Sequence, residues 1–209
     1  IDEGVFGEDA YTTLQRLGFL AKVQHKTLKG RNLQLRPDEL AYLKKLNRLP
    51  PSAAERIGDD KVRNKAIIKS IMKLDENWPV LVFATSVSHA QALAAILVMK
   101  GVSAAAIHSS TSDGERRHQI AQFRSGNIRV LTNYAVLTEG FDAPKIRALY
   151  ITRPTYSPNL YQQMIGRGLR GPKNGGKPEC LLVDVAGNIE KYQGQLAFTE
   201  FEGLWADGH

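Results

Sequence analysis

Five short apolar runs in the second half of the chain most constrain the fold. They are five to seven residues long, are rich in Val, Ile, Leu and Ala, and lie at residues 79–85, 102–108, 128–132, 148–152 and 180–185. Runs with so little polar alternation are typical of strands buried on both faces. Strands separated by segments of helix length form parallel sheets. The pattern therefore predicts an α/β fold of three layers, a parallel sheet with helices on both faces.

The segments between these runs carry helix signals. In the stretch 59–74, Val62, Ile67 and Ile71 recur at helical spacing and predict one face packed on a core. Another helix is expected before Gly101, a natural C-terminal cap. Ser112 and Glu115 have the spacing of a capping box and predict the start of a third helix. Before residue 59 we expect a short strand within 19–28, and a helix that begins near residue 38 and stops at the prolines 50–51.

Composition narrows the class of protein. The chain has 209 residues, 43% of them hydrophobic, which suits one sizeable core with an extension. Its net charge of +7 favours a polyanionic partner. A single cysteine, Cys180, excludes an internal disulfide framework and a cysteine-rich zinc site, and the histidines have no metal-like spacing. We expect no bound metal from the chain's own residues.

Domain organisation and location follow from the same reading. We expect a connector or extension over 1–58, the α/β domain over 59–195, and a tail over 196–209. No apolar run approaches the ~20 residues of a membrane span and no signal peptide opens the chain. These features predict an intracellular protein, cytoplasmic or associated with the nucleoid, with no membrane partner. The first residue is Ile1, so we expect a piece of a longer protein.

Polar residues gather where the predicted strands end. Thr85 and Ser86 follow the first run, the segment 108–111 the second, and Thr132 the third. In a parallel sheet these positions share one edge, where ligands collect. Hydroxyls and backbone N–H groups at helix starts bind phosphate oxygens, although the same residues also serve as helix caps. For any single residue both interpretations remain open, but the repetition of such residues at successive strand ends favours an anion-facing edge.

The segment 157–171 combines glycines with arginines. Ser157-Pro158 is a strong helix start, and on a continuous helix Gln163, Arg167 and Arg170 would share one narrow sector. Planar guanidinium groups match phosphate, while the alternative is a solvated basic face. Gly166 and Gly168 either allow another surface to approach the backbone closely or end the helix. The G-x-G-x-x-G pattern here does not follow a strand, so a dinucleotide fingerprint is rejected.

A third cluster, residues 130–144, joins a strand end to a Gly-Phe-Asp-Ala-Pro sequence. A carboxylate such as Asp142, beside Gly140, accepts hydrogen bonds from a ribose hydroxyl or orients a water molecule. Gly, Asp and Pro are also ordinary turn residues. Local physical chemistry leaves these two readings open.

Together these pieces resemble the second RecA-like domain of superfamily 2 helicases and translocases, over about residues 60–186. "VLVFATSVSHA" resembles motif IV of that family, "VLTNYAVLTEGFDAP" motif V, and "YQQMIGRGLRG" motif VI, Q-x-x-G-R-x-x-R. The segment "IHSSTSDGERRHQIAQFRSG" is similar to the one between motifs IV and V. The form "QMIGRGLR" is most similar to the branch of restriction-enzyme motor subunits and DNA-repair translocases. That branch implies double-stranded DNA as the partner, with RNA as the alternative.

The resemblance implies roles for individual positions. Arg167 and Arg170 would face the γ-phosphate of ATP, with Arg170 as the arginine finger and Gln163 as a nucleotide or coupling residue. The nucleotide edge would be lined by Gly140, Asp142 and Gly166. The nucleic-acid backbone would be contacted by Thr85, Ser86, Thr132 and His108.

Two ATP-site motifs expected of such a motor, the P-loop and the D-E motif, are missing from the sequence. The chain has no G-x-x-x-x-G-K-[ST], and Asp75-Glu76 lies at the end of an amphipathic helix instead of after a buried strand. The resemblance thus implies a P-loop NTPase fold without its P-loop. ATP with Mg²⁺, the metal held mainly elsewhere, would bind against an N-terminal RecA-like domain of the same polypeptide.

The sequence therefore predicts the C-terminal motor domain of an ATP-dependent DNA helicase or translocase, inactive as an isolated chain. The competing hypothesis is a docking module for nucleic acid or protein that has the same fold but no motor partner.

Overall fold

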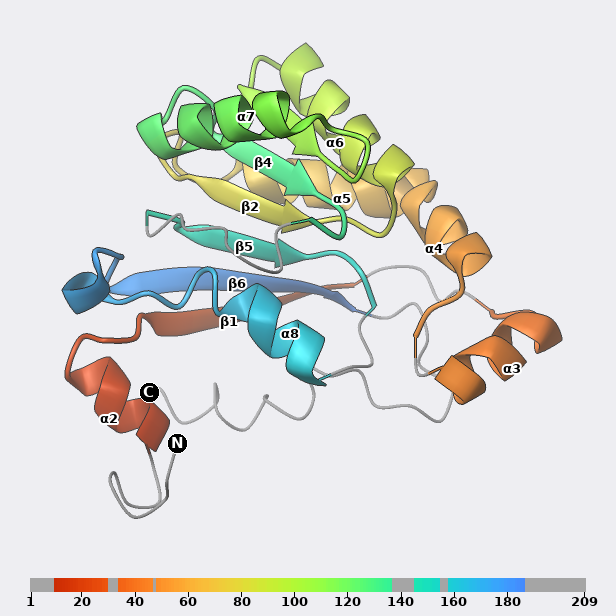
Figure 1. Ribbon diagram of the computed structural model, residues 1–209, viewed down its shortest axis with the longest axis horizontal. Coiled ribbons are helices and arrows are strands. Elements are labelled where there is room, and N and C mark those ends of the chain that lie inside the picture. Colours follow the sequence, from red (N-terminus) through yellow and green to blue (C-terminus); the bar gives the residue numbers. More distant parts are fainter. Residues whose placement is uncertain (1–9, 30–33, 47, 137–144, 155–157, 187–209) are drawn as a thin grey trace.

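A parallel sheet forms the centre of the molecule. The computed structural model describes residues 10–29, 34–46, 48–136, 145–154 and 158–186. Within these ranges six strands pair in the order β1-β6-β5-β2-β4-β3, every pair parallel (Figure 1). The strands are β1 (Lys22–Lys29), β2 (Val80–Phe83), β3 (Ala104–Ile107), β4 (Val130–Asn133), β5 (Ala148–Ile151) and β6 (Glu179–Ala186). Each of the five apolar runs is a strand, as predicted.

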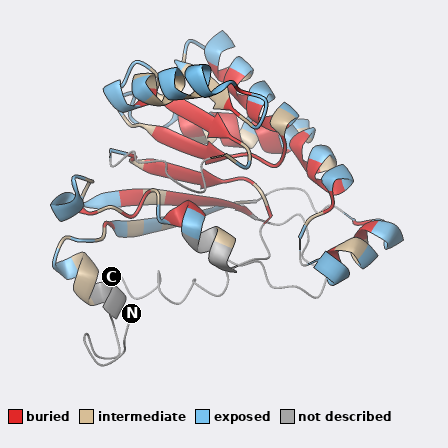
Figure 2. Ribbon diagram, viewed as in Figure 1, coloured by how far each residue is buried: buried red, intermediate tan, exposed pale blue. Residues whose placement is uncertain are grey.

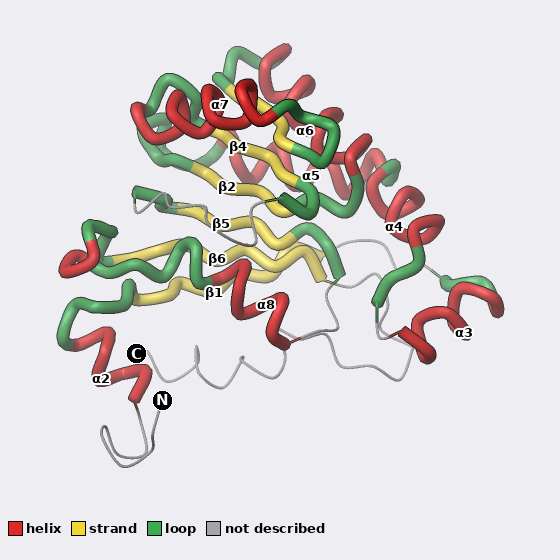
Figure 3. The backbone as a smooth tube through the Cα atoms, viewed as in Figure 1, coloured by secondary structure: helices red, strands yellow, loops and turns green. Residues whose placement is uncertain are grey.

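Helices connect the strands and flank the sheet (Figure 3). They are α2 (Ala10–Arg16), α3 (Pro37–Leu46), α4 (Pro51–Gly58), α5 (Lys61–Met72), α6 (Val87–Met99), α7 (Asp113–Ser125), α8 (Pro158–Ile165) and the 3-10 turn η2 (Pro172–Asn174). The predicted capping box is confirmed, since the Ser112 hydroxyl accepts a hydrogen bond from the Glu115 N–H at the start of α7. Gly101 has a φ of 80° just after α6, the left-handed conformation that ends helices.

Two apolar cores lie on opposite faces of the sheet. Side chains alternate along each strand, so Leu81 and Leu131 pack toward α7 and α8, while Val80 and Val130 pack toward α5 and α6. Figure 2 shows the resulting pattern, in which the central strands are buried and the outer surfaces of the helices are exposed. The predicted three-layer arrangement is confirmed.

The N-terminal part of the chain contributes an edge strand. β1 pairs with β6 along its whole length, from Lys22 opposite Glu179 to Lys29 opposite Ala186. The short strand expected within 19–28 is thus present, and it belongs to the sheet. The boundary at residue 59 stays a prediction, but part of the expected extension lies inside the fold.

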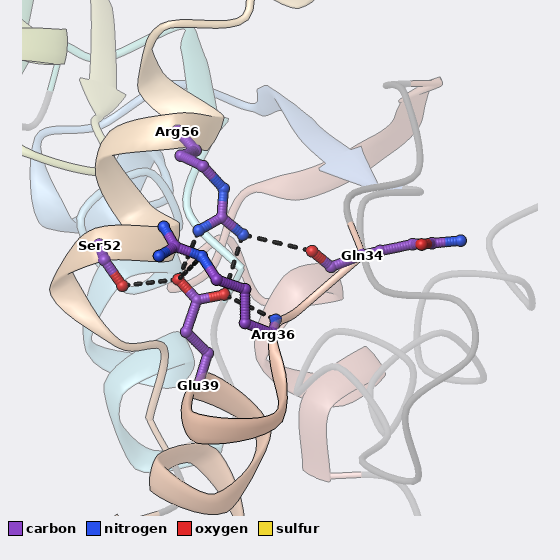
Figure 4. A network of polar contacts seen from close by, with 5 residues as sticks. All are labelled: Gln34, Arg36, Glu39, Ser52 and Arg56. Carbon is purple, nitrogen blue, oxygen red and sulfur yellow. Dashed lines mark hydrogen bonds and ion pairs between the residues drawn. The ribbon is translucent and has the colours of Figure 1, made fainter.

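The predicted helix ends before the prolines at 50–51, and these prolines start another helix instead of stopping the first. α3 ends at Leu46, and α4 starts directly at Pro51, a position that tolerates proline because its missing N–H has no helical partner. Glu39 of α3, 2% exposed, joins the two helices by accepting bonds from Ser52 at 2.6 Å and from both terminal nitrogens of Arg56 (Figure 4). Its hydrogen bonds with Arg56 lower the pKa of the Glu39 carboxyl to about 2.

Candidate functional site

The carboxyl ends of the central strands form one edge of the sheet. In register, Phe83 of β2 lies opposite both Asn133 of β4 and Ile151 of β5, and Ile107 of β3 lies opposite Asn133. The chain segments that follow these four positions therefore start side by side. Three of the four predicted nucleic-acid residues follow these strand ends, namely Thr85, Ser86 and His108, and Thr132 is the third residue of β4.

A buried polar network occupies the end of β2. The Thr85 N–H donates to Nδ1 of His89 at 3.2 Å, and the Thr85 hydroxyl lies 2.9 Å from the same nitrogen. Nε2 of His89 lies 2.9 Å from Oδ1 of Asn64 and donates to it. Burial, with the nearby charge of Arg63, lowers the His89 pKa to about 3, so this imidazole is neutral. Ser86 caps α6 by accepting from the His89 N–H at 3.1 Å. Both hydroxyls thus organise the helix start.

The structure corrects the prediction for Thr132. This residue is 0% exposed, and its hydroxyl donates to the carbonyl of Ala90 at 2.8 Å. Thr152, at the end of β5, is equally buried and donates to the carbonyl of Phe83 at 2.7 Å. These two hydroxyls join β4 to α6 and the end of β5 to β2. Thr132 has no surface with which to contact nucleic acid in this conformation.

His108 remains accessible. It is half-buried at the end of β3, with Nε2 3.0 Å from the side-chain amide nitrogen of Gln91 on α6. Its backbone N–H donates to the Thr111 hydroxyl at 3.0 Å. Nδ1 of His108 is buried and has no hydrogen-bond partner within the described part of the chain. The structure therefore brings His108 and the start of α6 to the same edge.

Arg63 is a buried cation at this edge that the sequence analysis missed. It is 1% exposed and donates to the carbonyls of Thr152 and Val185, which end two neighbouring strands. Burial lowers the pKa of its guanidinium to about 10, so it stays charged at neutral pH. A signal was present, since Arg63 lies on the same helical stripe as the core residues Ile67 and Ile71.

A second arginine lies beside the ends of β4 and β5. The Arg153 guanidinium is 5.6 Å from the centre of the Tyr134 ring, and burial lowers its pKa. Asn133, the last residue of β4, donates to the carbonyl of Val82 on β2 at 3.1 Å, while its Oδ1 is buried and has no partner among the described residues. The edge therefore combines positive charge with helix N-termini, an arrangement that favours anions.

The prediction that Gln163, Arg167 and Arg170 share one face of a helix is wrong. α8 ends at Ile165, and residues 166–168 form a turn in which Arg167 N–H bonds back to the Met164 carbonyl at 3.2 Å. Arg170 lies beyond that turn in an isolated antiparallel bridge with Leu20. The helix stops because the next segment pairs with the chain that enters β1 instead. We name residues 166–171 the arginine turn.

The arginine turn lies away from the carboxyl edge. The Ala21 N–H donates to the Leu169 carbonyl at 2.9 Å and the Gly171 N–H donates to the Phe19 carbonyl at 3.0 Å, directly before β1 starts at Lys22. These contacts place the end of the turn at the amino ends of β1 and β6. The structure therefore separates the predicted phosphate-facing arginines from the predicted nucleic-acid residues.

Close packing explains the glycines of the arginine turn. A Cβ on Gly168 would lie 2.8 Å from the Cys180 sulfur and 3.6 Å from Cβ of Leu149. A Cβ on Gly171 would collide with the backbone of Gly18 and Leu20. Of the two alternatives that the sequence left open, the helix end and the close approach both occur, since Gly166 follows the last helical residue.

The arginine turn is therefore fixed against the sheet. Arg167 and Arg170 are both half-buried, and Gln163 of α8 and Gly166 are exposed. Gly140 and Asp142 lie outside the described residues.

The described residues contain neither a metal-binding cluster nor a membrane-spanning helix. No group of three or more His, Cys, Asp or Glu side chains in the described ranges is arranged to hold a metal ion. Over those ranges, no helix combines the length and the apolar character needed to span a bilayer.

Sequence comparison identifies relatives of this chain. It is 33% identical over 127 residues to IRC3 of Saccharomyces cerevisiae and 39% identical over 131 residues to irc3 of Schizosaccharomyces pombe. Both are named as ATP-dependent helicases, and the second as mitochondrial. The matches cover 59% of this chain but only 18% and 21% of those relatives, so the chain spans about a fifth of their length.

Solved structures share the fold. The C-terminal domain of the DEAD-box protein Dbp5 aligns with a TM-score of 0.57 over 92% of this chain and 89% of that domain, at 14% identity. A DEAD box protein from Methanococcus jannaschii aligns with a TM-score of 0.55 over 68% of this chain and 36% of that protein, at 24% identity. Similarity at this identity supports the RecA-like fold alone.

A protein-family profile also matches the chain. The profile described as "Helicase conserved C-terminal domain" matches residues 63–171, just over half of the chain. That range starts at the buried Arg63 and ends with the arginine turn, and it contains all three motifs seen in the sequence. The chain belongs to the helicase conserved C-terminal domain family, the second RecA-like domain of superfamily 2 helicases.

Proposed function

We propose that this domain completes the ATP site of a helicase or translocase whose N-terminal RecA-like domain binds the nucleotide. Arg167 and Arg170 would reach the γ-phosphate across the interface, with Gln163 and Gly166 beside them, and with Gly140 and Asp142 at the nucleotide edge. Phosphoryl transfer needs positive charge where the γ-phosphate charge develops, and an arginine finger is worth ~10³–10⁵ in rate.

One observation carries this proposal, the fixed geometry of the arginine turn. The turn has no room for side chains at Gly168 and Gly171, and backbone hydrogen bonds join it to the segment before β1. A charged group held in advance loses little conformational freedom when the second domain closes on it, which is what electrostatic catalysis requires. Mg²⁺ would neutralise phosphate charge from the other domain.

The experiment uses the full-length protein. Arg170→Ala should lower the ATP turnover number about a thousandfold or more while the dissociation constant for ATP changes little. Arg16→Ala is the matched control, because Arg16 is an exposed arginine on α2, outside the arginine turn. Normal turnover in Arg170→Ala would reject the finger assignment. The 209-residue chain alone should show no ATPase activity.

We further propose DNA, double-stranded in particular, as the polymer along which the motor moves. His108 and the N–H groups at the start of α6, which the buried Ser86 caps, would contact its phosphates, with the Arg63 and Arg153 charges nearby. RNA is the alternative, because other relatives are named as RNA helicases, DDX49 of Homo sapiens and ROK1 of Yarrowia lipolytica. Stimulation of the full-length ATPase by duplex DNA, single-stranded DNA and RNA of equal length separates these cases. The proposal places the full-length protein inside the cell or an organelle, where ATP and nucleic acid occur.

A further inference from the structure

A groove on the outer surface of α5 and α6 is used by neither the arginine turn nor the carboxyl edge. It has a volume of about 770 Å³, and its floor is formed by Ile68, Met72 and Ile96. α5 and α6 pack on the face of the sheet opposite to α8. The groove is therefore a surface of the domain separate from the face that α8 covers.

The rim of this groove is strongly basic. Four of its lysines recur every fourth residue from the start of α5 to its C-terminal cap, about 6 Å apart along the helix axis, and a fifth follows α6; they are Lys61, Lys65, Lys69, Lys73 and Lys100. All five are exposed, and none forms an ion pair among the described residues. Like charges at this spacing repel one another, so the face is stabilised by an anionic partner.

The chemistry of the groove favours a peptide over nucleic acid. The floor is aliphatic, and the residues that line it include no arginine and no aromatic side chain. Proteins hold single strands through aromatic stacking and hold phosphates through planar guanidinium groups. An apolar floor beside a row of lysines is complementary to a segment with large apolar side chains and carboxylates.

The chain itself contains such a segment. Residues 196–207, LAFTEFEGLWAD, include five large apolar side chains, three carboxylates and no lysine or arginine. We propose that this acidic aromatic segment binds in the lysine-rimmed groove of its own domain. Phe201 and Trp205 would cover the aliphatic floor, and Glu200 and Glu202 would pair with the rim.

The position where the chain leaves the sheet supports binding within one molecule. Val185, near the end of β6, accepts a hydrogen bond from Arg63 in the first turn of α5 at 3.5 Å. The ten residues from 186 to 196 extend up to about 33 Å, and α5, with twelve residues, is about 18 Å long. The segment is therefore long enough to reach every lysine of α5.

Carbodiimide coupling tests the proposal on the intact chain at low micromolar concentration. This reagent joins a carboxylate and an ammonium group that are in contact, and peptide mass spectrometry identifies the pairs. We expect amide bonds from Glu200 or Glu202 to Lys65 and Lys69, at least tenfold more abundant than bonds to Lys44 and Lys45. Those two lysines are exposed on α3 and serve as internal controls.

A charge exchange makes the test specific. The double reversal Lys65→Glu with Lys69→Glu should reduce coupling to the remaining groove lysines at least fivefold, with an unchanged melting temperature. Adding Glu200→Lys and Glu202→Lys should restore cross-links, now with the charges exchanged. Equal coupling to the α3 lysines, or no effect of the reversal, would overturn the proposal.

Two other occupants have distinct outcomes. Cross-links found only between molecules, in proportion to protein concentration, would assign the groove to a second copy and overturn binding in cis. Protection of the groove lysines from acetylation by a single-stranded oligonucleotide, with no coupling to residues 196–207, would assign the groove to nucleic acid. Neither outcome bears on the ATP site.

Discussion

Gly168 decides the path of the backbone between the two arginines of the turn. It faces the Cys180 sulfur at the start of β6, and burial raises the pKa of that thiol to about 12, which keeps it a neutral packing group. Arg167 and Arg170 flank this contact. At the scale of single residues, the site therefore depends on a position that has no side chain at all.

Gly168→Ala is expected to destabilise the domain by about 1–3 kcal/mol, because the new methyl group is forced against Cys180 in a packed core. Thermal unfolding measures the effect, which corresponds to roughly 2–4 °C per kcal/mol for a chain of this size. Gly114→Ala is the matched control, since a Cβ there meets nothing within 4 Å. Adding Cys180→Ala should recover part of the loss, and an absence of recovery would contradict this packing argument.

The junction of α3 and α4 is the element whose stability should depend on pH. The Glu39 carboxylate holds the two helices together through Ser52 and Arg56 and also accepts from the Arg36 N–H at 2.9 Å. Its pKa is lowered from 4.5 to about 2 in the folded protein. A lowered pKa adds stability that is complete above pH 4.5 and is lost as pH falls toward 2.

Glu39→Gln is expected to lower the free energy of unfolding by about 2 kcal/mol at pH 7, the range for a hydrogen-bonded charged group. The difference between the variant and the natural chain should shrink steadily from pH 4.5 downward, as the carboxylate of the natural chain becomes protonated. Urea unfolding at several pH values measures it. Glu76→Gln, at an exposed carboxylate, is the control, and a difference that stays constant down to pH 3 would contradict the assignment.

At the scale of the whole molecule, the sheet joins distant parts of the sequence. β1 and β6 pair in register although more than 150 residues separate Lys22 from Glu179, and the arginine turn bonds to the segment just before β1. The segment before β1 therefore supports the arginine turn through backbone hydrogen bonds.

Amide hydrogen exchange should show that β1 unfolds with the rest of the sheet. Amides of β1 that bond to β6 are expected to exchange with the same free energy of opening as amides of the central strand β2, because both belong to one cooperative unit. The exposed turn at Ser109-Ser110 provides an unprotected reference. Opening of β1 at a much lower free energy would show that it is an appended strand, as the domain boundary at residue 59 predicts.

Local sequence determined the elements of this protein. The apolar runs, the capping box at Ser112 and the C-terminal glycine after α6 each depend on near neighbours, so their structures follow from spacing and residue type. The same holds for the order of motifs that links the chain to its family. The prediction that Gln163, Arg167 and Arg170 share one helical sector was wrong. Residue spacing places side chains on one face only if the helix continues, and α8 ends at Ile165.

Only the tertiary structure decided where those elements end and which polar groups stay accessible. The arginine turn leaves the helix because the chain entering β1 offers hydrogen bonds that no neighbour in sequence supplies. Thr132 and Arg63 are buried because strands and helices from distant segments close over them. Burial and long-range pairing depend on the whole set of contacts, and a single stretch of sequence does not contain that information.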